Sequence, residues 1–358
     1  MDLERLLART IQEGKTPGLQ YVVVGPAATL FEYCGGAANL ASGRLVRPDT
    51  TLMAYSMSKT ITAAAVLQLV DAHAIKLDEP IARYLDWQPY GGAITVRHLL
   101  SHTSGIPNPI PLRWVHPAAE HATFDDQAVL RLIVKLHPRL AFAPGTNYRY
   151  SNIGYWLLGA IVERACDQPF VTYVMTRVVQ ALGIPSSEMA YTVADAGRHA
   201  SGYLEKYSLM NLAKGWLIDR DLIGEYSGRW LRIRDHYPNG PAFGGLVGCA
   251  GGFGKFLQDS LRTHPLLFGP AARALFVEQQ RTTAGPIPMT LGWHMGSTDT
   301  TRYLFKEGGG RGFHCMMRLY PDARIGTVMM LNATGANVAS MLDAVDVVAL
   351  RTLQPAAR

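Results

Sequence analysis

The chain has 358 residues, of which 48% are apolar and 17% charged, and its formal net charge is +6. These values are typical of a globular protein with one large core or two closely joined ones, and they exclude a mainly disordered chain. The positive charges are scattered, except for an alternating basic stretch at 229–234 that predicts a strand with one basic face. Nucleic-acid binding is therefore not expected.

The N-terminal part of the chain is predicted to begin a sheet. Residues 2–13 have the pattern of a helix, and residues 19–24 and 29–33 have that of strands separated by a Gly-Pro turn. The Ala-rich segment 59–72 has apolar residues at helical spacing, which predicts a buried helix. Ser56 stands just before this helix.

The first ten residues form a charged amphipathic pattern without the apolar segment of a secretory signal. We therefore expect a cytoplasmic protein, or a periplasmic one if a signal peptide was removed. No apolar run reaches the roughly 20 residues that a membrane-spanning helix needs. The sequence contains no indication of an oligomeric state.

The middle of the chain is predicted to be helical, with helices at 96–101, 126–137, 153–166 and 171–182. Residues 186–245 have no clear period and are rich in tyrosine, tryptophan and phenylalanine. We interpret them as an irregular, cap-like structure over a cleft.

The C-terminal part returns to strands. A short helix at 253–261 precedes predicted strands at 289–295, 303–306, 313–320 and 325–331, and a helix at 338–353 closes the chain.

Strands at both ends with helices between them predict a mixed α/β (α+β) protein, in which both termini build one sheet and a mostly helical region is inserted. We expect an α/β part at 1–80 that carries the Ser56 helix, and a helical domain at 81–245 with a cap-like insertion at 204–245. The second α/β part then follows at 246–358.

Ser56 and Lys59 form a Ser-x-x-Lys motif at the start of the predicted buried helix. On a helix, residues three apart lie on one face, so the Lys59 amine can reach the Ser56 hydroxyl. A serine hydroxyl needs a neighbouring base to become a nucleophile. Lys59 can be that base only if its pKa falls from about 10.4 towards 7, which burial and a second cation can achieve. The pattern predicts a serine hydrolase that forms an acyl-enzyme.

Tyr150 and Asn152 form a Tyr-x-Asn motif in a turn before a predicted long helix. Tyr150 can relay a proton, and Asn152 can bind a substrate carbonyl or hold the lysine. A second Tyr-x-Asn match at Tyr237 and Asn239 has no helix after it, and we interpret it as a chance match.

Lys306, Glu307, Gly308 and Gly309 end a predicted strand, and the glycines allow a substrate to approach the backbone. Lys306 would be the second cation beside Lys59. The segment that begins at His294 competes for this position, but it lacks the glycine run that follows Lys306.

In this order the motifs resemble those of the class C β-lactamase-related serine hydrolases, which include penicillin-binding DD-peptidases and family VIII carboxylesterases. The flanking segments 77–85, 98–107 and 309–313 are also similar to those of this family, and the similarity covers about residues 15–335 except 204–246. The resemblance implies a β-lactamase/DD-peptidase-like fold with an antiparallel sheet flanked by helices, and no cofactor.

The resemblance also implies roles for individual residues. Ser56 would be the nucleophile, Lys59 and Tyr150 would share the role of general base, and Asn152 would orient the substrate. Lys306 would lower the pKa of the Tyr-Lys pair. Gly309 matches the strand position whose N–H completes the oxyanion hole with that of Ser56, and Gly308 and Glu307 flank the bound substrate.

Glu307 departs from the family pattern, because β-lactam-recognising relatives usually carry Thr or Ser at this position. A carboxylate that points into the cleft would repel an anionic substrate. The sequence therefore favours a carboxylic ester of small or medium size as substrate. A β-lactam or a D-amino-acid amide or peptide is the alternative, and a non-catalytic, penicillin-binding-like scaffold is a second one.

Two other kinds of site are not favoured. The four cysteines form no Cys-x-x-Cys pair, so neither a zinc cluster nor a disulfide framework is predicted. His98 and His102 have metal-ligand spacing, but no glutamate follows His98 as the His-Glu-x-x-His motif requires, and we expect no metal. The chain also lacks the Gly-x-Ser-x-Gly motif of α/β-hydrolases.

Overall fold

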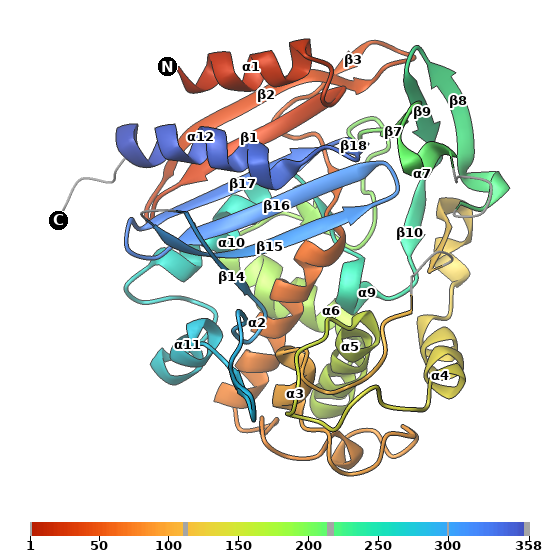
Figure 1. Cartoon of the computed structure of the whole chain (residues 1–358), viewed down its shortest axis with the longest axis vertical. Helices are drawn as coiled ribbons and strands as arrows, with labels where there is room; N and C mark the ends of the chain where they lie inside the picture. The colour runs from red at the N-terminus through yellow and green to blue at the C-terminus, as the bar shows by residue number, and fades with distance from the viewer. Residues whose placement is uncertain (1, 110–113, 213–217, 299–300, 354–358) are drawn as a thin grey trace.

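The computed structural model of the protein describes residues 2–109, 114–212, 218–298 and 301–353. A seven-stranded antiparallel sheet runs in the order β14-β15-β16-β17-β1-β2-β3. Its strands are β1 (Gly18–Val24), β2 (Thr29–Asn39), β3 (Arg44–Leu45), β14 (His294–Ser297), β15 (Arg302–Gly310), β16 (Phe313–Tyr320) and β17 (Ile325–Leu331). Strands from both ends of the chain lie side by side in Figure 1, where β1 pairs with β17. The predicted mixed α/β fold with a sheet built from both termini is confirmed.

Side chains alternate along each strand, so the two faces of this sheet present different residues. Different helices cover these two faces. The odd-numbered residues of β1 lie in a buried cluster with α1 (Leu3–Gln12) and α12 (Val338–Thr352). Val22 and Val24 point the other way, into the large core that includes α10 (Ala250–Leu261). Figure 1 shows α1 and α12 as the outer layer of the molecule.

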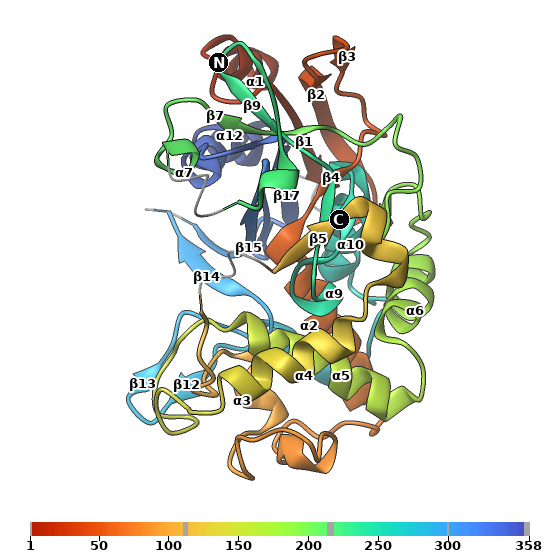
Figure 2. The same ribbon diagram turned by 90° about the vertical axis from the view of Figure 1, so that its right-hand side faces the viewer.

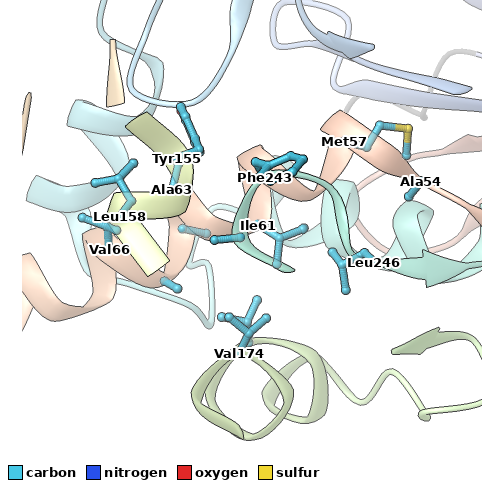
Figure 3. Close-up of a cluster of buried hydrophobic side chains, with 14 of the residues drawn as sticks. Ala54, Met57, Ile61, Ala63, Val66, Tyr155, Leu158, Val174, Phe243 and Leu246 are labelled. Atoms are coloured by element: carbon cyan, nitrogen blue, oxygen red, sulfur yellow. The ribbon is translucent and has the colours of Figure 1, made fainter. Parts of the chain in front are cut away.

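The helix α2 (Ser58–Asp71) runs through the large core, and 11 of its residues are buried. Its small alanines let α5 (Asn152–Cys166) and α9 (Pro241–Gly244) pack closely against it. Figure 3 shows this contact, with Tyr155 of α5 and Phe243 of α9 beside the side chains of α2. The predicted buried helix is therefore present, and it connects the sheet to the helical region.

The helical region lies below the sheet in Figure 2, and it contains the predicted helices. These are α3 (Val96–Leu100), α4 (Asp126–Leu136), α5 and α6 (Phe170–Val174). The helix α6 continues as a π-helical segment (Met175–Val179) and then a 3₁₀ turn (Gln180–Leu182). None of the described helices has the length and apolar character needed to cross a bilayer.

The interpretation of 186–245 as irregular is wrong for much of this segment. It contains β6 (Met189–Ala190), β7 (Gly202–Glu205), α7 (Leu209–Leu212), β8 (Ile223–Ser227), β9 (Trp230–Ile233) and β10 (His236–Pro238). The strands β7, β9 and β8 form a small sheet with β18 (Ala333–Thr334), and β9 is the strand predicted from the basic alternation. The other strands are short; β6, β7 and β10 pair with segments that are distant in the chain, whereas β8 forms a hairpin with β9.

The remaining elements are short. The predicted strand at 289–295 is wrong except at its end, because β14 begins only at His294. The helix α11 (Pro270–Val277) was not predicted. The small strands are β4 (Leu52–Met53), β5 (Val115–Pro117), β11 (Val247–Gly248), β12 (Arg281–Thr282) and β13 (Gly285–Pro286).

Candidate active site

Ser56 lies in the 3₁₀ turn η1 (Tyr55–Met57), which leads directly into α2. The helical path from Ser56 to Lys59 puts the Lys59 Nζ 2.9 Å from the Ser56 Oγ. The Tyr150 hydroxyl donates a hydrogen bond of 2.8 Å to the same oxygen. Three residues that the sequence singled out therefore meet at one oxygen atom.

Tyr55, the residue before Ser56, has a φ of +44°, which is rare for a residue other than glycine. Its hydroxyl donates to the Arg311 carbonyl at 2.9 Å and lies 2.8 Å from the His236 Nε2. These contacts hold the left-handed turn, which costs roughly 1–2 kcal/mol. The turn sets the direction in which the next residue, Ser56, faces.

The Lys59 amine is fully buried at the base of the site. It donates a hydrogen bond of 2.7 Å to the carbonyl of Phe243, at the end of the segment that the sequence assigned to the insertion. Burial lowers the pKa of Lys59 well below its usual value, and the nearby charge of Lys306 lowers it further. A neutral amine that donates to Phe243 keeps its lone pair free to accept the Ser56 proton.

Tyr150 precedes α5, whose N-terminus is capped by Ser151 through a hydrogen bond of 3.2 Å from the Gly154 N–H. Burial raises the pKa of Tyr150, so the phenol keeps its proton and donates it to Ser56. The environments of Lys59 and Tyr150 thus shift their pKa values in opposite directions. Such a pair can supply a base and an acid at the same pH.

Lys306 points from β15 into the same site, and burial lowers its pKa to about 7. Its Nζ lies 3.5 Å from the Nε2 of His294, on the neighbouring strand β14. Burial, together with the charges of Lys306 and Lys59, lowers the pKa of His294 to about 2, so this ring is neutral. Lys306 and His294, the two candidates in the sequence for the start of the third motif, are therefore neighbours in the structure.

Asn152 is the first residue of α5, and it is buried at the helix N-terminus that follows Tyr150. Its backbone N–H donates to the Asn108 Oδ1 at 3.0 Å. Ser151, the extended N-cap of α5, is the one residue between Tyr150 and Asn152, and the loop that carries Asn108 contacts the start of this helix.

The glycines of β15 allow the strand to contact the turn that carries Ser56. A Cβ added to Gly308 would lie 2.0 Å from the Ala54 carbonyl oxygen and 3.0 Å from the Ser56 nitrogen. A Cβ on Gly310 would lie 2.3 Å from the Tyr55 ring, whereas one on Gly309 would meet only the His314 ring, at 3.3 Å. Gly308 and Gly310 are thus required for packing, and Gly309 faces away from η1.

Glu307 lies on the opposite face of β15 from Lys306. It pairs across the sheet with Met316, which belongs to the core under α12, whereas Lys306 pairs with Met317 of the large core. The Glu307 carboxylate lies 2.6 Å from the His314 Nε2 and is exposed. The Glu307 side chain therefore does not share the face of Lys306, although burial and, to a lesser degree, the charge of Glu307 raise the pKa of Tyr150, and position 307 lacks a hydroxyl.

Three groups at the site were missed as site residues. The Tyr155 ring lies beside both amines, its centroid 5.8 Å from the Lys59 Nζ and 5.6 Å from the Lys306 Nζ, and the Phe243 ring lies 5.4 Å from the Lys59 Nζ. The His102 ring packs on Tyr150 with 4.4 Å between centroids. Of these three, only His102 could have been found from the sequence, because it lies in the segment 98–107 that is similar to the family's. Tyr155 and Phe243 reach the site through tertiary packing.

The remaining candidates have other partners. Tyr237 accepts a hydrogen bond from the Val193 N–H, and the Asn239 Oδ1 lies 2.9 Å from the His116 Nδ1, so both contribute to packing around β10. The His98 Nδ1 accepts from the Thr95 N–H in a capping box. Within the described ranges, no three His, Cys, Asp or Glu side chains are grouped as metal ligands would be.

Comparison with known proteins shows two curated relatives. The esterase EstB of Burkholderia gladioli is 30% identical over 215 residues, which are 56% of this chain and 54% of that protein. A D-aminopeptidase of Brucella canis is 25% identical over 336 residues, which are 93% and 60% of the two chains. The chain thus spans less than two thirds of the length of these relatives.

Among solved structures, the D-amino acid amidase of Ochrobactrum anthropi complexed with L-phenylalanine has the same fold. It superposes with a TM-score of 0.80 at 19% identity and covers 98% of each chain. The family model described as Beta-lactamase matches residues 3–350, which is nearly the whole chain. With the sheet, the Ser56 turn and the two buried lysines in place, we conclude that the chain belongs to the Beta-lactamase family.

Proposed function

We propose that the protein is a serine hydrolase that cleaves carboxylic esters of small or medium size through an acyl-enzyme at Ser56. The observation that carries this proposal is the double contact of the Ser56 Oγ, with the Lys59 amine at 2.9 Å and the Tyr150 hydroxyl at 2.8 Å. Nucleophilic catalysis by serine requires an adjacent base within this range.

In acylation, neutral Lys59 takes the Ser56 proton while the Oγ forms a bond to the ester carbonyl carbon. The tetrahedral intermediate then breaks its bond to the alcohol oxygen, and Tyr150 donates its proton to that leaving group. The proton held by Lys59 restores the Tyr150 phenol. Both groups then have their original protonation states, as the opposite pKa shifts of the pair favour.

Deacylation reverses these steps, with water in the place of the alcohol. Water gives a proton to Tyr150 as Tyr150 passes its own to Lys59, and the water oxygen bonds to the acyl carbon. Lys59 then returns the proton to the departing Ser56 Oγ. The backbone N–H groups of Ser56 and Gly309 would stabilise the oxyanion in both halves of the reaction.

The preference for esters rests on position 307 and on a relative. Lys306 is followed by Glu307 rather than by a hydroxyl residue that can bind the carboxylate of a β-lactam. Glu307 itself is engaged with His314 on the other face of β15. EstB, which is named an esterase, is 30% identical over the matched segment.

A D-amino-acid amide is the second candidate substrate. The similarity to the Brucella D-aminopeptidase extends over 93% of this chain, whereas that to EstB covers 56%. A scaffold without catalysis is less well supported, because Lys59 and Tyr150 both contact the Ser56 Oγ.

Two experiments test the proposal. A fluorophosphonate probe should label the protein, mass spectrometry should place the adduct on Ser56, and Ser56→Ala should abolish it; a wild-type protein without an adduct would support the scaffold. Next, kcat/KM is compared for p-nitrophenyl esters of graded chain length, nitrocefin and D-alanyl amides. We expect the esters to react fastest, and faster turnover of nitrocefin or the amides would contradict the ester assignment.

A further inference from the structure

His102 holds the backbone on both sides of Tyr150. Its carbonyl accepts a hydrogen bond of 2.9 Å from the Arg149 N–H, and its ring Nδ1 accepts one of 3.2 Å from the Ser151 N–H. Its ring also packs against the Tyr150 ring, with 4.4 Å between centroids. A single residue therefore contacts Tyr150 and both of its neighbours in the chain.

The backbone of His102 is committed to this arrangement. The residue follows the C-terminus of α3 in a left-handed conformation, with a φ of +58°. Residues other than glycine keep such a conformation only where the surrounding structure enforces it. On its other side the ring packs against Tyr155 of α5, at 4.9 Å between centroids. His102 thus connects α3, the Tyr150 turn and α5.

From these contacts we infer that His102 is a positioning residue that holds the Tyr150 hydroxyl against Ser56, and that it does so as the neutral Nε2–H tautomer. The inference rests on the proposed role of Tyr150 in acyl transfer. His102 itself need not touch the substrate, because it acts through the turn that carries Tyr150.

The hydrogen bonds determine the tautomer. The Nδ1 can accept from the Ser151 N–H only if it carries no proton, so the ring proton must be on the Nε2. The Nε2 is buried and has no hydrogen-bond partner in the described part of the chain. An imidazolium would need both nitrogens protonated, which would break the bond to Ser151.

The groups that face His102 also oppose a positive charge. Lys59, Lys306 and His294 lie near it, and the tyrosines Tyr150 and Tyr155 keep their protons. Burial, first of all, and these neighbouring basic groups lower the pKa of His102 well below its usual value. Burial and these neighbours therefore favour the neutral ring that the hydrogen bond from Ser151 requires.

The test uses His102→Phe, which keeps a flat ring but removes the acceptor, and His102→Asn, whose Oδ1 can accept from Ser151. The matched control is His98→Phe, because the His98 Nδ1 also accepts from a backbone N–H at 3.2 Å, four residues earlier and outside the proposed machinery. For each variant, the thermal unfolding midpoint, kcat, KM, the pH profile of kcat/KM and the rate of fluorophosphonate labelling are measured.

We expect His102→Phe to lower kcat and the labelling rate by about 10- to 100-fold, the cost of a misplacement near 1 Å. KM should hardly change, and the acidic limb of the pH profile should move because Tyr150 no longer contacts the Ser56–Lys59 pair. His102→Asn should recover part of kcat. His98→Phe should show at most a loss of thermal stability, with wild-type kcat and pH profile.

Several results would overturn the inference. One is a folded His102→Phe with wild-type kcat and labelling rate, and another is an equal loss of kcat in His98→Phe. If the variants do not fold, the ¹⁵N chemical shifts of the histidine rings in the wild-type protein test the inference. An Nδ1–H tautomer or an imidazolium at His102 would contradict the inference. Absence of any Ser56 adduct in the wild type would instead refute the proposed function.

Discussion

Lys306 is an amine that the fold removes completely from water. Its described polar neighbour is the neutral His294, and burial alone lowers its pKa to about 7. Burying an ionisable group without a counter-charge is unfavourable for stability. Lys59 lies in the same situation, so the site keeps two amines that are suited to proton transfer and that reduce the stability of the protein.

We expect Lys306→Met to be more stable than the wild type at pH 6, by a few kcal/mol, and to lose activity. Between pH 7 and about 10.5 the unfolded chain binds a proton on Lys306 that the folded protein does not, so wild-type stability rises with pH in this window. The advantage of Lys306→Met should therefore shrink from pH 7 to pH 10. Urea unfolding at pH 6, 8 and 10 measures the free energy of unfolding of both proteins. A difference in this free energy that stays constant with pH would contradict the buried-lysine explanation.

At the scale of elements, the contact between β15 and η1 depends on the absence of side chains. Gly308 touches the backbone of Ala54 and Ser56, and Gly310 touches the ring of Tyr55. The strand can therefore lie directly against the turn that carries Ser56. A glycine run that the sequence suggested as a surface for the substrate is, at two of its three positions, a packing surface.

Gly308→Ala should therefore destabilise the protein by about 1–3 kcal/mol or more, because its Cβ would meet backbone atoms that cannot move aside. Gly309→Ala is the matched change on the same strand, and its Cβ would meet only the side chain of His314. Thermal unfolding of both variants is the measurement. Equal losses of stability would show that β15 and η1 are less closely packed than these contacts imply.

At the scale of the whole molecule, α12 is attached to the sheet by a buried polar network on the face opposite the site. The Asp346 carboxylate accepts hydrogen bonds from Tyr21 of β1, Tyr320 of β16 and Thr327 of β17, at 2.7, 2.7 and 3.0 Å. It also lies 3.5 Å from Arg318. The network joins strands from the two ends of the chain, so it supports the sheet without touching Ser56.

Asp346→Ala should lower the free energy of unfolding by about 3–5 kcal/mol, since it leaves Arg318 buried without its buried partner. Asp343 contacts the same guanidinium at 2.8 Å but is exposed, so Asp343→Ala should cost less than about 1 kcal/mol. Chemical denaturation of both variants measures these losses in the free energy of unfolding. The kcat of folded Asp346→Ala should equal that of the wild type, and a lower value would mean that the network reaches the site.

Local patterns in the sequence determined the helix that follows Ser56, the long helix after Tyr150, and most strands of the main sheet. They also determined the Ser56–Lys59 pair, because residues three apart on a helix must lie on one face. The motif predicted that the pKa of Lys59 must be lowered, since a serine nucleophile needs a base that is neutral, but the burial and the Lys306 charge that lower it come from the fold.

Only the tertiary structure decided the rest, because it depends on segments that are distant in the chain. The pairing of β7 with β18, the Phe243 carbonyl on Lys59, and the approach of His294 to Lys306 leave no local pattern. The direction of Glu307 required the register between β15 and β16, since a shift of one residue exchanges the two faces of a strand. The sequence therefore predicted the Ser56–Lys59 pair, and the fold determined which groups surround it.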